Sequence, residues 1–218
     1  WDPVVPVSAL DVDRYTGRWY QAYSSYTVSS LLEQHGACVT ADYAAQDDGS
    51  ISVVNTARVM TADGDLIEIG GSAFVEDASE PGKLKVRLDG MPVEAPYWVL
   101  ALGDEDGSGP YPWAIVSDPL RAFLFVLVRD LEAFADSQDQ TDLLDKCEEL
   151  GFTAFWNSPR QTDQEGCEYT ASAAAVAAPF AEEEKKGVAT AFELSRALNL
   201  RGGGLVAGPL HASCKVRV

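Results

Sequence analysis

Between Trp19 and Arg129, apolar and polar side chains alternate in short runs that are separated by turn sequences. Such alternation is typical of half-buried β-strands, and Asp-Gly pairs between two runs, as at 48–49 and 63–64, are strong hairpin signals. The pattern predicts strands at 18–26, 38–45, 51–60, 66–75, 83–89, 97–102, 113–117 and 123–129. Eight strands joined by local hairpins form an antiparallel meander. Open sheet edges promote aggregation, so we expect this meander to close into a barrel or fold into a sandwich.

After Arg129 the hydrophobic period changes to that of a helix. The segment 141–150 predicts one amphipathic helix, with Asp139 or Thr141 as its N-cap and Gly151 at its end. The apolar positions of this helix recur at helical spacing and are Leu143, Leu144, Cys147 and Leu150.

The composition shifts again beyond Cys167, where alanine- and glycine-rich stretches flank a charged cluster. This indicates two parts: a barrel with its helix at 1–167, and a C-terminal extension at 168–218 that packs on the barrel or extends from it. We expect one helix in the extension, near 189–198.

The charge balance excludes several classes of partner. The 218 residues include 16 basic and 34 acidic side chains, which gives a net charge of −18. Such a charge repels phosphate backbones and anionic lipids, so nucleic acid is not an expected partner. The longest apolar run, 122–128, has the length of a strand, and no window approaches the roughly 20 apolar residues of a transmembrane helix.

The four cysteines are Cys38, Cys147, Cys167 and Cys214; none forms a C-x-x-C motif, and only two histidines accompany them. This pattern disfavours a zinc site and favours two disulfides. The sequence starts at Trp1 without an initiator Met or a signal segment, which is typical of a processed mature chain. We therefore expect an exported, oxidising compartment, extracellular or periplasm-like, with the thylakoid lumen as the alternative.

The sequence contains no motif typical of a nucleophilic, phosphate-binding or zinc-dependent enzyme. The acidic run 104–106 lacks the spaced ligands of a calcium loop and is better explained as a solvated loop tip. We expect no catalytic residues, no metal and no required cofactor, although a bound lipid or pigment is compatible with the pattern.

Several segments resemble one family when they are taken together and in order. They are 10–20, which contains Gly17-Arg18-Trp19, then 38–43, 51–55, 80–86, 97–100 and 123–129. They resemble the lipocalins, and within them the branch of apolipoprotein D and the bacterial outer-membrane lipocalin, over about residues 8–167. The family's T-D-x-x-Y turn is altered here, because an insertion at 105–110 separates Gly103-Asp104 from Tyr111.

The resemblance implies an all-β fold: an eight-stranded antiparallel up-and-down barrel, the lipocalin calyx, with one C-terminal α-helix and the extra C-terminal extension. Tyr43, Asn55 and Phe125 match calyx-lining positions of that branch. Alternation from these positions also places inside the barrel Val39, Ala41, Ile51, Val53, Phe123 and Leu127. These residues either line a pocket for a hydrophobic molecule or fill a solid core. In the pocket, Asn55 would orient the ligand.

The resemblance also implies two structural features. Gly17, Trp19 and Arg129 would close the narrow end of the barrel, with the guanidinium stacked on the indole. Cys38 would pair with Cys167 in a disulfide, which leaves Cys147 to pair with Cys214.

Two functional hypotheses follow. The first is a carrier or scavenger of a small hydrophobic ligand, such as a fatty acid, sterol, carotenoid or tetrapyrrole. The second is a structural subunit whose extension docks on a larger membrane-associated complex, for instance a photosynthetic one. A lipocalin-fold enzyme acting on lipids or xanthophylls is a further alternative, which is disfavoured because Cys38 matches a disulfide cysteine.

Overall fold

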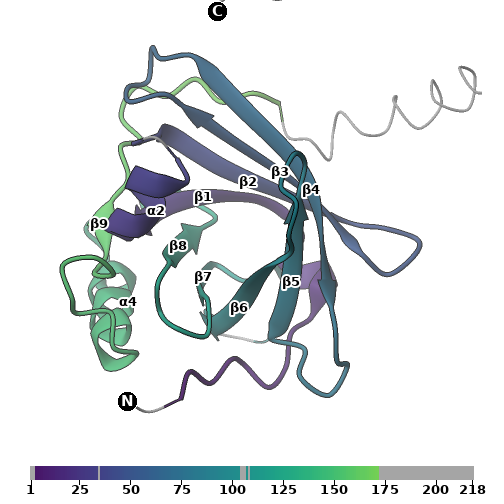
Figure 1. Ribbon diagram of the computed structural model, residues 1–218. Helices are drawn as coiled ribbons and strands as arrows, with labels where there is room; N and C mark the ends of the chain where they lie inside the picture. The colour runs from purple at the N-terminus through teal and green to yellow at the C-terminus, as the bar shows by residue number, and fades with distance from the viewer. Residues whose placement is uncertain (1–2, 34, 104–106, 108, 172–218) are drawn as a thin grey trace, which may run out of the picture. The chain divides into compact units, whose positions relative to one another are not determined.

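The computed structural model describes residues 3–33, 35–103, 107 and 109–171, which form a barrel with short flanking helices (Figure 1). The barrel strands are β1 (Gly17–Ser24), β2 (Ala37–Ala45), β3 (Ile51–Arg58), β4 (Leu66–Val75), β5 (Lys83–Leu88), β6 (Ala95–Leu102), β7 (Trp113–Ser117) and β8 (Leu124–Val128). Each strand pairs antiparallel with the next in sequence. These bounds differ from the predicted ones by a few residues at most.

The sheet closes because β1 pairs with β2 on one side and with β8 on the other. Trp19 lies opposite Ala41 in the first ladder, and Tyr20 lies opposite Val128 in the second. The eight-stranded up-and-down barrel predicted above is therefore confirmed, and closure leaves no open edge between the first and last strands.

A short ninth strand enters the barrel wall where β1 and β2 separate. The β1–β2 ladder ends at Tyr20, and farther along β1 its residues pair with β9 (Arg160–Gln161). The amide of Cys38 in β2 donates to the carbonyl of Asp163, 2.8 Å away. The segment 160–167 thus bridges β1 and β2 and carries Cys167 to Cys38.

The disulfide between Cys38 and Cys167 is confirmed, with Cα atoms 5.5 Å apart. It joins β2 to the segment that follows β9. Cys147 is a free, fully buried thiol, and its side chain packs among apolar residues between helix and barrel. The second predicted pair, Cys147 with Cys214, involves a residue outside the described ones and stays a prediction.

The predicted C-terminal helix is α4 (Gln138–Glu149), which packs against the outside of the barrel (Figure 1). Its N-cap is Ser137, whose hydroxyl accepts from the amide of Gln140, so the predicted caps Asp139 and Thr141 are wrong. The predicted end is right: Gly151 has φ of +90°, the left-handed conformation that follows many helices.

Three short helices were not expected: α1 (Val12–Tyr15), α2 (Tyr26–Leu31) and α3 (Leu131–Phe134). The strand predicted at 18–26 ends earlier, because the Ser25 hydroxyl caps α2 by accepting from the amide of Val28. Helix α1 is capped in the same way by the carboxylate of Asp11.

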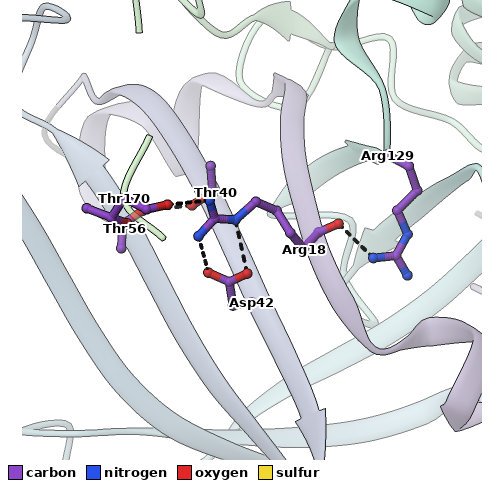
Figure 2. A network of polar contacts seen from close by, with 6 residues as sticks. All are labelled: Arg18, Thr40, Asp42, Thr56, Arg129 and Thr170. Carbon is purple, nitrogen blue, oxygen red and sulfur yellow. Dashed lines mark hydrogen bonds and ion pairs between the residues drawn. The ribbon is translucent and has the colours of Figure 1, made fainter. Parts of the chain in front are cut away.

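The first residues of the predicted extension lie against the barrel. Arg18 pairs with Asp42 of the neighbouring strand and also donates to the carbonyl of Thr170 (Figure 2). The Tyr169 ring packs edge-on against Tyr20, with centroids 4.9 Å apart. The rest of the extension, including the helix expected at 189–198, lies outside the described residues, as does the acidic run 104–106.

Candidate functional site

Arg129 closes one end of the barrel. Its guanidinium donates to five backbone carbonyls at 2.7 to 3.3 Å: Nη2 shares its two hydrogens among those of Arg14, Tyr15 and Thr16, Nη1 donates to Arg18 and Nε to Tyr111. One of these bonds, to Arg18, is drawn in Figure 2. Burial lowers the pKa of Arg129 to about 10, a value at which the side chain is still a cation at neutral pH.

The indole of Trp19 lies beneath this guanidinium, whose Cζ is 3.6 Å from the ring centroid. Trp19 is fully buried, and its Nε1 donates to the carbonyl of Tyr15. Gly17 has φ of +96°, and a Cβ at this position would lie 3.2 Å from the Arg129 side chain. The three residues therefore form a packed plug, in which the motif Gly-x-Trp leaves room for the arginine.

Above this closed end the barrel encloses a cavity of about 410 Å³. The structure places in its wall every residue expected to face inward: Val39, Ala41, Tyr43, Ile51, Val53, Asn55, Phe123, Phe125 and Leu127. Other apolar side chains from β4 to β6 complete the wall, among them Ile67, Ile69, Leu84, Val86 and Leu88. The interior is therefore a lined space and not a solid core, with the apolar character of a small-molecule pocket.

Three tyrosines in the cavity wall form a hydroxyl chain. The hydroxyl of Tyr97 lies 2.8 Å from that of Tyr15 and 3.1 Å from that of Tyr43. Burial is the main cause that raises the pKa of Tyr43 to about 12 and those of Tyr15 and Tyr97 well above the usual 10, so all three are neutral. Three O–H donors make two hydrogen bonds, which leaves one donor for a ligand or a water molecule.

Asn55 lies in the wall on β3, and its side-chain amide makes no hydrogen bond to any described residue. An amide that faces an apolar space gains stability from a polar partner. Its position agrees with the orienting role expected from sequence, and that role stays a prediction.

Glu33 and Gln21 add a second polar group to the cavity wall. The Gln21 amide donates to Oε2 of Glu33 and to the hydroxyl of Thr162, both at 3.0 Å. Burial raises the pKa of Glu33 to about 7, and the bond from Gln21 offsets this only in part. No local sequence signal marks Tyr15, Tyr97, Gln21 or Glu33, because the contacts that define their roles join positions up to 141 residues apart.

The loops opposite the plug have apolar tips. All four connections at this end carry an exposed large apolar side chain: the end of α2 with the segment after it, and the β3–β4, β5–β6 and β7–β8 loops. These side chains are Leu31, Leu32, Met60, Met91, Val93 and Leu120. Three of them, Leu32, Met91 and Val93, also line the cavity, so this end is its mouth.

Within the described residues, no group of three or more histidine, cysteine, aspartate or glutamate side chains is arranged to hold a metal ion. The described helices also include none with the length and hydropathy needed to cross a membrane.

An eight-stranded barrel with one plugged end and an apolar cavity behind an apolar mouth defines the class of small-molecule-binding calyx proteins. The lipocalin-like domain profile matches residues 10–157, which is more than half of the sequence. The chain belongs to the lipocalin family, whose members bind small hydrophobic ligands and are not, as a class, enzymes.

Relatives at moderate identity support this assignment. Temperature-induced lipocalin-1 of Arabidopsis thaliana is 33% identical over 153 residues, which cover 67% of this chain and 76% of that protein. Apolipoprotein D of Bos taurus is 36% identical over 97 residues, which cover 44% of this chain and 48% of that protein. The chain thus spans about half the length of the apolipoprotein D relatives that it matches.

Solved structures show the same fold at lower identity. Lobster apocrustacyanin A1 superposes with a TM-score of 0.50 and 20% identity, over 75% of this chain and 92% of that one.

Proposed function

We propose that this protein binds one small lipophilic molecule in the barrel cavity and carries or sequesters it. The observation that carries the proposal is the cavity of about 410 Å³, apolar over most of its wall and opening between apolar loop tips. In the bound state Tyr43, Val53, Ala41, Phe123 and Phe125 contact the apolar body of the ligand, and Asn55 binds its polar group.

The expected affinity follows from the buried area. A ligand that loses about 300 Å² of apolar surface gains roughly 7 kcal/mol, before the cost of ordering ligand and side chains. Micromolar binding is physically reasonable on this basis. The ligand classes that we favour are fatty acids, sterols, carotenoids and tetrapyrroles.

The test is calorimetric titration of the apo protein with members of these classes, in parallel with a variant whose cavity is reduced. Val53 lines the cavity on β3, and its cross-strand neighbour Gly71 has no side chain to obstruct a larger residue. We expect Val53→Trp to weaken binding at least tenfold, because the indole occupies part of the space that the ligand requires.

The matched control is Val54→Trp, which makes the same substitution on the next residue, whose side chain points to the other face of the strand. This variant should bind like the wild type. Equal affinity in all three proteins would place the ligand outside the cavity. Failure of every ligand class to bind would favour the alternative of a structural subunit.

The compartment forms part of the proposal. The disulfide between Cys38 and Cys167 supports an exported, oxidising environment, where such bonds persist. The choice among the extracellular space, a periplasm and a thylakoid lumen stays a prediction.

A further inference from the structure

The charged groups of the cavity wall all have one sign. Among the described residues that line the cavity, Glu33 and Asp118 carry carboxyl groups, and none carries a lysine, arginine or histidine side chain. Both carboxyls lie towards the mouth, at the end of the cavity opposite the Arg129 cation, so the potential at the mouth is negative, which favours a positively charged guest there.

The two carboxyl groups differ in whether they have an oxygen that is free to accept a hydrogen bond from a ligand. Both oxygens of Asp118 accept from backbone amides, Oδ1 from Leu120 at 2.7 Å and Oδ2 from Phe123 at 2.8 Å. These bonds shape the β7–β8 loop and occupy the carboxylate. Asp118 therefore has a structural role at the mouth.

Glu33 is the group left to receive a ligand. Its Oε2 accepts from Gln21, and Oε1 makes no hydrogen bond to any described residue. Gln21 uses both amide hydrogens to join Glu33 to Thr162, so the carboxyl is fixed in position by the segment 160–167. Glu33 also follows the C-terminal end of α2, where backbone carbonyls add to the negative potential.

We propose that the cavity selects amphiphilic ligands whose head group is a basic amine, with Glu33 as the counter-charge near the mouth. This inference rests on the proposed function and changes its set of ligand classes: it adds lipophilic amines to the classes given above and removes fatty acids from them. The alkyl body of the ligand occupies the apolar cavity, and the ammonium donates to Oε1 of Glu33. An anionic head group, such as a fatty acid carboxylate, is repelled from the same position.

The selectivity depends on the charge of Glu33. Since burial raises the pKa of this carboxyl to about 7, it becomes an anion above neutrality and an uncharged acid below it. Gln21 and Thr162, which join it to the wall, do not titrate. The other titratable groups of the cavity wall are Asp118, whose carboxylate accepts from two backbone amides, and the neutral tyrosines. His35, two positions after Glu33, is exposed.

The experiment compares three probes with the same chain length and different head groups: dodecylamine, dodecanol and dodecanoate, each below its micellar concentration. Affinities are measured by calorimetry at about pH 8.5 and about pH 5.5, on either side of the Glu33 pKa, while the amine stays protonated. In the wild type we expect the amine to bind about tenfold tighter than the alcohol at the higher pH, and this ratio to fall towards one at the lower pH. The carboxylate should bind weakest at the higher pH.

The variant Glu33→Gln keeps the size of the side chain and an acceptor for Gln21, and it should lose the preference for the amine at both pH values. Glu68→Gln removes one negative charge from an exposed position on β4 that does not line the cavity, and it should retain the preference. His35→Gln should retain the pH dependence, which assigns the titration to Glu33. Thermal melting of each variant establishes that it is folded.

The outcomes separate the two proposals. If dodecanol binds but the amine is not preferred, or if Glu33→Gln keeps the preference, the inference about Glu33 is overturned and the proposed function stands. If none of the three probes binds to the wild type, the proposed function fails, and the inference fails with it.

Discussion

The side chain of Arg129 joins parts of the chain that are distant in sequence: helix α1, strand β1 and the segment before β7. Its guanidinium donates to five backbone carbonyls from these three parts and covers Trp19. A planar group with five N–H donors is the one side chain that can make this set of contacts.

We expect Arg129→Ala to lower the free energy of unfolding by on the order of 3 kcal/mol, because buried carbonyls lose their donors and the indole loses its cation. The free energy of unfolding of Arg129→Lys should lie between those of the wild type and Arg129→Ala, since an ammonium keeps the charge but cannot reach all the acceptors. Urea denaturation measures both effects.

The control for this prediction is Arg87→Ala, which removes an exposed arginine from a surface ion pair with Glu94 and should change the unfolding free energy by less than about 1 kcal/mol. Below its melting temperature, Arg129→Ala should still bind ligand, because the plug lies at the end opposite the mouth. A variant that melted like the wild type but lost ligand binding would contradict the structural role.

Among the secondary-structure elements, those that depend on a local sequence pattern could be predicted. The eight strands were predictable because each buries one face, so that alternation fixes both the strand and the residues that face inward, such as Val53 and Asn55. The start of α4 was missed because Ser137, Asp139 and Thr141 are all acceptable caps, and only the geometry of the chain selects Ser137.

Elements that depend on distant partners could not be predicted. Tyr26–Leu31 contains tyrosine, threonine and valine, which favour strands, yet it forms α2 because Ser25 caps it and Val28 packs into the interior. Strand β9 is two residues long and has no signal of its own; it exists because β1 and β2 separate and leave edges to pair. Thr162, directly after β9, holds the Gln21 amide that donates to Glu33.

The packing of α4 on the barrel leads to a prediction about Cys147. Burial raises the pKa of this thiol to about 12, and its side chain is fully enclosed by the helix and the strands beneath it. Since the thiolate is the reactive form, iodoacetamide at about pH 8 should modify Cys147 only when the helix detaches or the chain unfolds.

Peptide mapping after alkylation measures this, with the same protein in urea as the fully reactive control. Asp145→Ala, which changes an exposed residue of the same helix, should leave the rate of Cys147 alkylation unchanged. Leu143→Ala should raise this rate, because Leu143 packs the helix against the barrel beside the thiol. Rapid labelling of Cys147 in the native protein would show that the helix is not packed as described. A Cys147–Cys214 peptide in the same map would confirm the second predicted disulfide.

At the scale of the whole molecule, the two ends of the barrel differ in chemistry. Connections at both ends carry exposed acidic side chains, such as Asp47 and Asp77 at the plugged end and Asp63 and Asp89 at the mouth, but the loops of the mouth also carry exposed large apolar ones. Part of the entrance is therefore apolar despite the large negative charge of the chain. An apolar ligand reaches the cavity along apolar loop tips.

The disulfide between Cys38 and Cys167 closes a loop across a separation of 129 residues, nearly the whole described barrel. On chain entropy alone, a loop of this length stabilises the fold by roughly 4 to 5 kcal/mol. The bond also holds the segment 160–167 in the wall, where the amides of Cys38 and Thr162 donate to the carbonyls of Asp163 and Ala22.

We therefore expect Cys38→Ser/Cys167→Ser to lower the global stability by a few kcal/mol and to loosen the mouth before the plug. Hydrogen exchange measures the second effect: the amides at positions 38 and 162 should exchange much faster than in the oxidised wild type. The amide of Arg129, which donates to the carbonyl of Pro112 at the closed end, should change only with global stability. If hydrogen exchange accelerates equally at both ends of the barrel, the disulfide acts on the unfolded chain alone. If exchange accelerates selectively at the mouth, the segment 160–167 is the part of the wall that the disulfide holds in place.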